Sequence, residues 1–261
     1  MKITTLLENK TTCDALRCEH GLSLYIETEK HKILFDSGAS DAFWENARAL
    51  GIDLAQVDIA FLSHAHNDHC GGLLTFLRGN RTAKVYLQKE AFGDYYVVTP
   101  TKCAFIGLDP KLHEYADRFV MAEGVTKLDD ELTLFSGIRT HDLLSEANAT
   151  LREKVGGDYP RDAFRHEQDL LVTEHGKTVL FAASAPSGLV NIINRAEDIL
   201  GRAPDYVFAG FHLYNPSLGQ SEPRALVDAV GERLRARKAT RSVAGHCTGA
   251  GGYAWLRGPL G

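Results

Sequence analysis

Runs of apolar residues divide the first third of the chain into short strands and a helix. Residues 23–28 and 32–38 are two β-branched and aromatic runs separated by a polar Glu-Lys-His turn region, which predicts a β-hairpin. Apolar residues recur at helical spacing between 40 and 50 and predict a helix there. Residues 57–63 form a nearly continuous apolar run, which is typical of a strand buried on both faces.

The middle of the chain has a weaker pattern. Residues 73–77 predict a helix and residues 84–88 predict another strand. From about 99 to 165 the order of apolar and polar positions is irregular. The polar stretch at 146–165 is typical either of an active-site wall or lid or of a plain surface loop.

The last third of the chain has the clearest succession of elements. Residues 187–200 predict a helix that stops at Gly201, and residues 222–237 predict a second helix. Hairpins with interspersed helices favour layered sheets covered by helices over a Rossmann fold. Since no long Pro-, Ser- or Gly-rich linker marks a boundary, we expect a single domain over residues 1–261. Strands are predicted at residues 170–174, 178–184, 206–211 and 242–245.

Composition and charge narrow the class of protein. Hydrophobic residues make up 44% and charged residues 24% of the 261 positions, which is typical of soluble globular proteins. The net charge of −5 argues against nucleic-acid binding, which relies on cationic contacts to phosphates. No apolar run is long enough to span a bilayer, and the first residues turn polar too early for a signal peptide. We therefore expect a cytoplasmic protein without a membrane partner. Whether the chain forms a homo-oligomer stays open. Five cysteines without a CxxC pair predict free thiols.

A dense cluster of metal-ligating side chains follows the predicted strand at 57–63. The chain reads HAHNDHCGG, which places His64, His66, Asp68 and His69 ahead of Cys70 and two glycines. These nitrogen and oxygen donors suit zinc, manganese or iron. In an extended stretch, alternate positions share a side, so His64 and His66 can hold one ion while a turn redirects Asp68 and His69 toward a second. Chance clustering among eleven histidines is the alternative, but crowding titratable groups against an apolar core costs free energy.

This loop resembles the HxHxDH signature of the metallo-β-lactamase superfamily. Residues 34–38, LFDSG, resemble the first motif of the superfamily, and residues 51–73 match it closely. Residues 187–193, 210–213 and 245–249 are similar to one branch in particular. That branch contains ribofuranosylaminobenzene phosphate synthase-like, dihydropterin-condensing enzymes and uncharacterised metal-dependent hydrolases. The resemblance implies an α+β fold, an αβ/βα four-layer sandwich with two sheets face to face, helices outside and metals at one sheet edge.

The resemblance also implies a set of metal ligands. His212 follows a predicted strand in GFHL and is expected to be a metal ligand or a donor to the substrate. The other ligands implied by the resemblance are His64 and His66 in one half-site, Asp68 and His69 in the second, and His246 near the C-terminus.

Three residues carry expected roles beyond ligation. Asp68 is the expected catalytic residue, which orients the attacking water or shuttles its proton, with direct ligation of the metal as the alternative. Tyr214, just after His212, is expected to contact substrate by donating to an oxyanion, although a tyrosine at a sheet edge needs no such role. Asp36 is expected to lie near the metal loop and to contact substrate.

The chain departs from the branch at two positions. Relatives carry a histidine before the helix at 187–200, whereas this chain has Ala185 or Pro186 at that place. A histidine–proline pair after an earlier strand is replaced by Gln88 and Lys89. Because zinc catalysis needs three protein ligands and an open position, we expect one firmly held ion and a second that is weak or vacant. Residues that could substitute as ligands are Cys247, His166 and Glu167.

Together these observations predict a metallohydrolase that acts on a small-molecule ester, lactone or phosphoester. Zinc is the expected cofactor, as one or two ions, with manganese or iron as alternatives. Two other functions stay open: a noncatalytic or single-metal binding protein with a degenerate site, and a pterin-condensing transferase. The Gly-rich run at 248–253 could bind a phosphate, but it is expected to lack the helix and the lysine of a P-loop.

Overall fold

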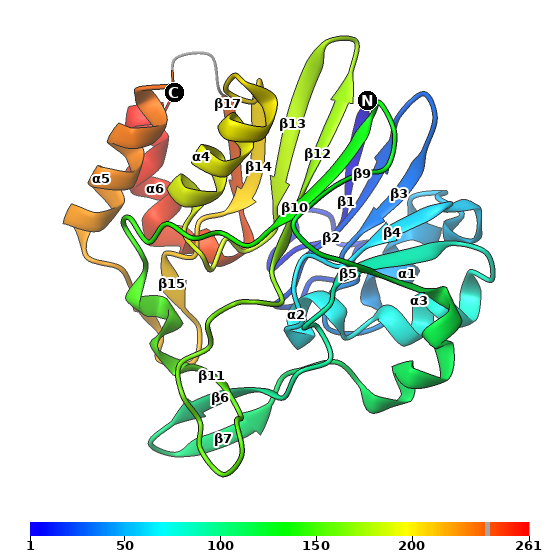
Figure 1. Cartoon of the computed structure of the whole chain (residues 1–261), viewed down its shortest axis with the longest axis horizontal. Coiled ribbons are helices and arrows are strands. Elements are labelled where there is room, and N and C mark those ends of the chain that lie inside the picture. The colour runs from blue at the N-terminus through cyan, green and yellow to red at the C-terminus, as the bar shows by residue number, and fades with distance from the viewer. Residues whose placement is uncertain (238–240, 261) are drawn as a thin grey trace.

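Two six-stranded β-sheets face each other, and helices cover the outer face of each sheet (Figure 1). The structure is a computed structural model that describes residues 1–237 and 241–260. The strand order is β1-β2-β3-β4-β5-β8 in the first sheet and β17-β14-β13-β12-β10-β9 in the second. The four layers are those predicted from the resemblance, and the α+β fold class is confirmed.

The first sheet combines an antiparallel edge with a parallel centre. Strands β1, β2 and β3 pair antiparallel, while β3, β4, β5 and β8 pair parallel. The hairpin predicted at 23–38 is confirmed as β2 and β3. The strands of this sheet are β1 (Lys2–Leu7), β2 (Ser23–Glu27), β3 (Lys32–Phe35), β4 (Ile59–Phe61), β5 (Lys84–Gln88) and β8 (Phe119–Ala122).

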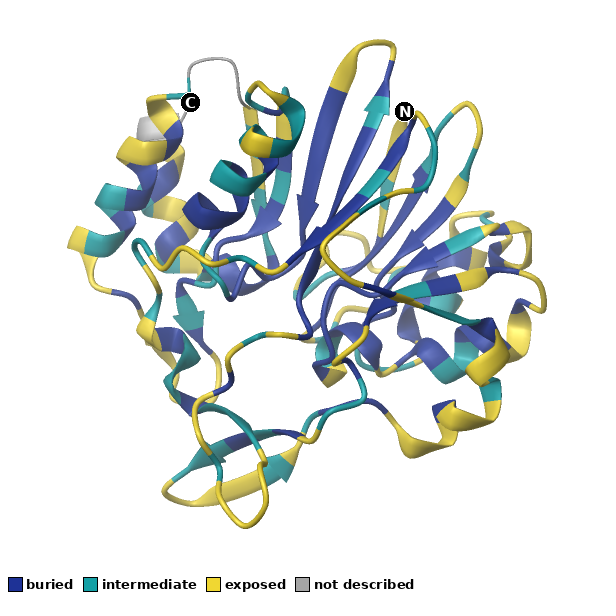
Figure 2. Ribbon diagram, in the orientation of Figure 1, coloured by how far each residue is buried: buried dark blue, intermediate teal, exposed yellow. Residues whose placement is uncertain are grey.

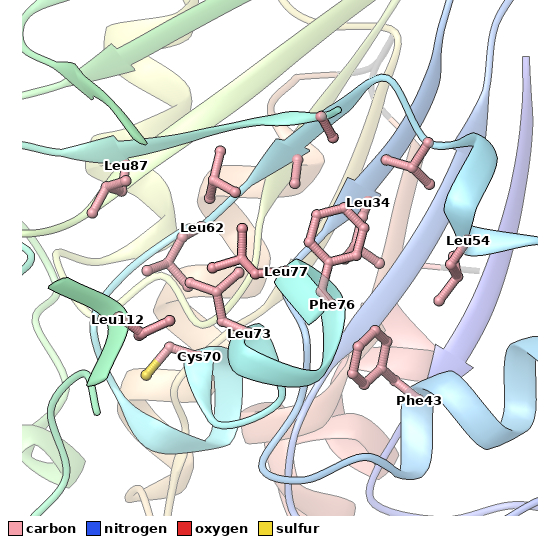
Figure 3. Close-up of a cluster of buried hydrophobic side chains, with 14 of the residues drawn as sticks. Leu34, Phe43, Leu54, Leu62, Cys70, Leu73, Phe76, Leu77, Leu87 and Leu112 are labelled. Atoms are coloured by element: carbon pink, nitrogen blue, oxygen red, sulfur yellow. The ribbon is translucent and has the colours of Figure 1, made fainter. Parts of the chain in front are cut away.

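Helices α1 (Ala42–Ala49) and α3 (Leu73–Gly79) pack on the outer face of the first sheet. Their apolar faces bury Phe43 and Phe76 against Leu34, as Figure 3 shows. The burial of these large side chains anchors the segment between β4 and α3, which carries the predicted metal loop.

The second sheet is antiparallel on one side and parallel on the other. Strands β9, β10, β12 and β13 pair antiparallel, whereas β13, β14 and β17 pair parallel. Its strands are β9 (Val125–Lys127), β10 (Leu132–Ser136), β12 (Gln168–Glu174), β13 (Lys177–Ala182), β14 (Tyr206–Gly210) and β17 (Arg241–Gly245).

Three helices cover the outer face of the second sheet: α4 (Leu189–Leu200), α5 (Arg224–Arg235) and α6 (Gly249–Leu260) (Figure 1). Gly201 ends α4 in the left-handed conformation, as the sequence predicts. The expectation that the Gly-rich run at 248–253 lacks a helix is wrong. Most of this run forms the first turns of α6, which packs on α5 through Leu256 and adjacent side chains.

Smaller elements surround one end of the sandwich. A three-stranded sheet joins β11 (Leu151–Glu153), β6 (Tyr95–Thr99) and β7 (Lys102–Phe105), and a two-stranded ribbon joins β15 (Tyr214–Asn215) and β16 (Gln220–Ser221). The short helices are α2 (Asn67–Cys70), η1 (Leu54–Gln56), η2 (Pro110–Arg118), η3 (Glu146–Thr150) and η4 (His246–Thr248).

The space between the two sheets is filled by apolar side chains from both. Phe35 of the first sheet and Phe181 of the second lie with their ring centroids 5.7 Å apart. Figure 2 shows the buried strands at the centre of the sandwich, with exposed residues concentrated in loops and in the β6–β7 hairpin. In the described part of the chain, no helix combines the length and apolarity needed to cross a bilayer.

Candidate metal centre

The carboxyl ends of the parallel strands in both sheets deliver the polar side chains of the candidate site. Asp36 follows β3, His212 follows the end of β14, and His246 follows β17. All three have left-handed backbone conformations, with φ of 58°, 50° and 47°. Such conformations are strained for residues other than glycine, and they are common at functional sites where the surrounding structure holds them.

Three ligand atoms converge at this edge of the sandwich. His69 Nε2 and His246 Nε2 lie 3.0 Å apart, and Asp68 Oδ2 lies 3.6 Å from the first and 3.4 Å from the second. Tetrahedral zinc with bonds of about 2.0–2.1 Å places its ligand atoms about 3.3 Å apart. The spacing of the three atoms therefore fits a single zinc-sized ion.

Hydrogen bonds to the other ring nitrogens determine which nitrogens face one another. His69 Nδ1 lies 2.7 Å from Asp36 Oδ2, and an ionised carboxylate only accepts, so His69 Nδ1 carries the proton. His246 Nδ1 lies 3.0 Å from Asn9 Oδ1, which also accepts from the Gly21 amide. In the neutral rings, both Nε2 atoms therefore present lone pairs to each other across 3.0 Å. A proton on one of the two nitrogens or a shared metal ion removes this repulsion, and the donor set of two imidazoles and a carboxylate fits a metal ion.

His64 and His66 form the other half of the predicted site. Their ring centroids lie 4.7 Å apart, and the His64 ring lies 4.2 Å from that of His69. Ser63 Oγ donates to Asp36 Oδ2 at 2.7 Å and lies 2.9 Å from His64 Nδ1. Because the single hydroxyl proton of Ser63 goes to Asp36, His64 Nδ1 donates to the serine and leaves its Nε2 lone pair free.

Ser184 and Ala185 follow β13, next to the place predicted for the absent histidine, Ala185 or Pro186. Ser184 Oγ lies 2.9 Å from His69 Nε2, and Ala185 is buried with a φ of 49°. A hydroxyl is a weaker zinc ligand than an imidazole. The structure therefore brings two imidazoles to the His64 half-site and two imidazoles with a carboxylate to the other half-site.

Burial lowers the pKa of His64 well below its ordinary value, and it lowers the pKa of His246 to about 4. For His69, burial lowers the pKa, but the carboxylates of Asp68 and Asp36 outweigh burial and raise it. Burial raises the pKa of Asp68, but His69 and the other neighbouring histidines lower it by more than burial raises it. The pKa of Asp68 is therefore well below its usual range. His64 and His246 are thus neutral and Asp68 is ionised at neutral pH, which are the protonation states required of metal ligands.

A cavity of about 380 Å³ opens over these groups. Asp68 and His246 line it, as do Ser184 and Tyr214. His212 also lines it and has a buried Nδ1 atom without a hydrogen-bond partner among the described residues. Burial lowers the pKa of His212 to about 3, so its ring is neutral and can accept a hydrogen bond or bind a metal ion. The wall interpretation of residues 146–165 is supported, since three of these residues line the cavity: Ala147, Thr150 and Leu151.

The structure places Asp36 differently from its predicted role as a substrate contact. Its side chain is completely buried and accepts from the Ser63 amide, the Ser63 hydroxyl and His69 Nδ1. With both oxygens occupied, the carboxylate is closed to substrate and instead orients His69. Gln88 and Lys89, at the place of the expected histidine–proline pair, line a different cavity.

Two of the suggested substitute ligands are engaged elsewhere. The Cys247 thiol donates to Ser184 O at 3.2 Å, and burial raises its pKa to about 12, so it stays protonated. His166 Nε2 lies 3.0 Å from Asp162 Oδ2. Glu167 is buried with Oε2 unpaired among the described residues.

Several contributing residues were missed by the sequence analysis. His20 Nε2 lies 3.2 Å from Asp68 Oδ2, and its ring stacks on His246 at 5.0 Å. Asn9 and Asp162 each contact a histidine of the site. These are single polar residues in loops. The one local signal in the sequence is the motif EHG before β2, in which His20 directly precedes a glycine; in the structure that glycine has a φ of 159°.

Comparisons with known proteins agree with this geometry. Residues 16–101 match the family model of the metallo-beta-lactamase superfamily. The chain is 26% identical over 265 residues to the 7,8-dihydropterin-6-methyl-4-(beta-D-ribofuranosyl)-aminobenzene-5'-phosphate synthase of Methanocaldococcus jannaschii, covering 95% of this chain and 88% of the relative. It is also 26% identical over 221 residues to an uncharacterized protein of the same organism, covering 81% of this chain and 80% of the relative.

Among solved structures, a metal-dependent hydrolase of the beta-lactamase superfamily aligns with a TM-score of 0.82 at 24% identity. The alignment covers 99% of this chain and 92% of that chain. This chain therefore has the metallo-β-lactamase fold, and the resemblance inferred from the HxHxDH loop is confirmed.

Proposed function

From its metallo-β-lactamase fold, we propose that this protein is a metal-dependent hydrolase of a small-molecule ester, lactone or phosphoester. The observation that carries the proposal is the convergence of Asp68 Oδ2, His69 Nε2 and His246 Nε2 within 3.0–3.6 Å at the wall of a cavity. Zinc is the proposed ion because imidazole nitrogens and a carboxylate oxygen are its usual ligands, and manganese or iron are alternatives.

A divalent ion held by these residues would supply water activated near neutral pH and would polarise the carbonyl or phosphoryl oxygen of the substrate. The chain supplies the groups that orient the reactants and move protons. Asp68 is ionised and lines the cavity, so its carboxylate can accept a hydrogen bond from the attacking water and, because its pKa is low, would pass the water's proton on and not keep it. His20 contacts the same carboxylate at 3.2 Å, and its side chain is 45% exposed, which offers the proton a route to solvent.

The cavity walls favour a small substrate with an apolar part. Val97 and Ile106 of the β6–β7 region and Leu151 of β11 form an apolar side, while Tyr214 and His212 bring hydrogen-bonding groups from the second sheet. We propose that Tyr214 and His212 contact the oxygen on which negative charge develops.

Metal reconstitution followed by a substrate panel tests the proposal. The chelated protein is loaded with zinc, manganese or iron, its metal content is measured, and turnover of esters, lactones and phosphoesters is followed. Turnover is expected to depend on metal and to be lost in His246→Ala, whereas His175→Ala, an exposed histidine that contacts Glu29, is the control. A protein that takes up no metal ends the proposal, and metal uptake without turnover favours a binding protein.

A pterin-condensing transferase is the second candidate. It is favoured by the 26% identity to the named synthase across 95% of this chain. Since a fold does not determine a reaction, activity must be measured directly. Incubation with a pterin diphosphate and a ribosylated aminobenzene distinguishes the two, because a condensed product would replace the hydrolase proposal.

A further inference from the structure

Three buried residues lie behind the His64 half-site. Asp162 Oδ2 lies 3.3 Å from His66 Nε2 and 3.0 Å from His166 Nε2. The three side chains are 1%, 5% and 0% exposed, and their atoms are close enough together to hold an ion. By distance alone, this group could be taken for an additional metal site.

The hydrogen bonds around His166 argue against that interpretation. The Ala65 amide donates to His166 Nδ1 at 3.0 Å, and a backbone N–H can only donate. His166 Nδ1 therefore carries a lone pair, and the ring proton is on Nε2, where it is donated to Asp162. Ligation of a metal through His166 Nε2 would require an imidazolate or the loss of the Ala65 bond.

The same carboxylate determines the orientation of His66. Asp162 Oδ1 accepts from the Phe164 amide at 2.7 Å, and Oδ2 faces the two imidazoles. Because an ionised carboxylate only accepts, His66 Nε2 is also a donor, and the lone pair of the neutral His66 ring lies on Nδ1. Asp162 thus accepts three hydrogen bonds and is fully engaged.

We propose that Asp162 and His166 are positioning residues that orient His66 so that its Nδ1 is the atom available to the metal. This inference rests on the proposed function, since it assigns a role in the same metal centre, at the His64–His66 half-site. Two contacts hold the metal loop from one segment: the Ala65 amide bonds to His166, and the His66 ring bonds to Asp162. The Tyr95 ring packs on His166 with centroids 3.9 Å apart and holds that ring in place.

The absence of a histidine at Ala185 or Pro186 makes this support more important. With only two imidazoles in the half-site, an ion there depends on how accurately both rings are held. Partners behind a ligating histidine typically contribute about 10–100-fold to metal affinity. The polar stretch at 146–165 would thereby act on the metal loop and not only as a cavity wall.

Measuring the tautomers of His66 and His166 in the metal-free protein tests the inference independently of metal binding and of enzymatic activity. Long-range ¹H–¹⁵N correlation spectra of the full chain, assigned with His66→Gln and His166→Gln variants, report which ring nitrogen is protonated. We expect Nε2–H at both His66 and His166 in the wild type. A proton on Nδ1 of His66 or of His166 would overturn the inference, even if the protein later proves to bind zinc.

Zinc affinity gives the second measurement. In Asp162→Asn, the amide NH₂ group faces at least one of the N–H groups that donate to Asp162 in the wild type. The His66 ring is then held less firmly, and we expect the zinc ion of the His64–His66 half-site to bind about 10–100-fold more weakly. Asp129→Asn is the matched control, because Asp129 also accepts hydrogen bonds from backbone amides and from a histidine, His31. His31 precedes β3, whereas the metal centre lies beyond the other end of that strand. Zinc is added with a competing chromophoric chelator, and circular dichroism confirms that both variants are folded.

The outcomes separate the two proposals. Zinc binding by the wild type that Asp162→Asn leaves unchanged, while His66→Gln weakens it, overturns the positioning role. An anomalous-scattering map of the zinc-loaded protein that places the ion within bonding distance of His166 would also overturn it. If the wild type binds no metal, the proposed function fails, and the tautomer spectra alone decide whether Asp162 and His166 orient His66.

Discussion

The buried carboxylate of Asp36 offers a sharp test of how the metal centre is held. Asn is nearly the same size as Asp and tolerates the left-handed backbone as well, so the φ of 58° is retained in Asp36→Asn. The change removes one negative charge and converts one acceptor oxygen into an NH₂ donor. All other contacts of the side chain stay in place.

The magnitude follows from the three hydrogen bonds that Asp36 accepts, each 2.7 Å long. If the NH₂ group replaces Oδ1, the Ser63 amide loses its acceptor, and if it replaces Oδ2, the Ser63 hydroxyl and His69 Nδ1 lose theirs. At least one buried hydrogen bond to a charged group disappears, which costs about 1.5–3 kcal/mol of unfolding free energy. If the NH₂ group replaces Oδ2, the loss of the partner behind His69 also weakens zinc binding by about 10–100-fold, and if it replaces Oδ1, His69 keeps only a neutral acceptor in place of a carboxylate and binding is weakened less.

Urea denaturation of the metal-free protein measures the first effect, and chelator competition measures the second. Asp129→Asn is again the control, with an expected change in zinc affinity of less than about threefold because it lies away from the site. Should Asp36→Asn bind zinc as tightly as the wild type while losing stability, the carboxylate would be structural only, and the orientation of His69 would need another explanation.

Three further outcomes are expected. Zinc should raise the melting temperature of the chelated wild type in a concentration-dependent way, and His246→Ala should abolish most of this shift. Burial raises the pKa of Glu167 to about 7, so the folded state binds this proton more tightly than the unfolded state, and stability falls as pH rises from about 4.5 to 7. Glu167→Gln should flatten that decline, by up to about 3 kcal/mol in denaturation curves measured across the range. In Gly72→Ala, the new Cβ would lie 2.2 Å from Ser37 O, so unfolding experiments should show a loss of at least about 2 kcal/mol. Gly51→Ala, with a positive φ but open space, should lose about 1 kcal/mol.

The parts of the fold that the sequence predicted are those with strong local patterns. The hairpin β2–β3, the buried strand β4 and the helix α4 each follow from runs of apolar residues and from turn or stop signals. The HAHNDH loop was recognisable because four metal-ligating residues, three histidines and an aspartate, lie within six residues. Its two glycines form the turn between α2 and α3, and they also allow close approach of the backbone at Ser37 and Ala39.

The rest of the site depends on contacts between distant segments. Asn9, His20 and Asp162 come from loops with no distinctive composition, and only the sheet topology brings them to the histidines. The helix α6 was missed because its glycines disfavour a helix locally, whereas packing on α5 stabilises it. Tertiary context outweighs local preference in each case.

The anchoring of His246 has a consequence for how the protein assembles. Its amide donates to Glu8 and its ring bonds to Asn9, so residues almost at opposite ends of the chain meet at one imidazole. Contacts of such long sequence separation form late in folding, because closing the intervening chain costs entropy before it gains stability. A nascent chain that does not yet contain His246, or a nicked chain that has lost its first strand, would then fail to retain an ion at the proposed site, and uptake of the ion would report that synthesis and folding are complete.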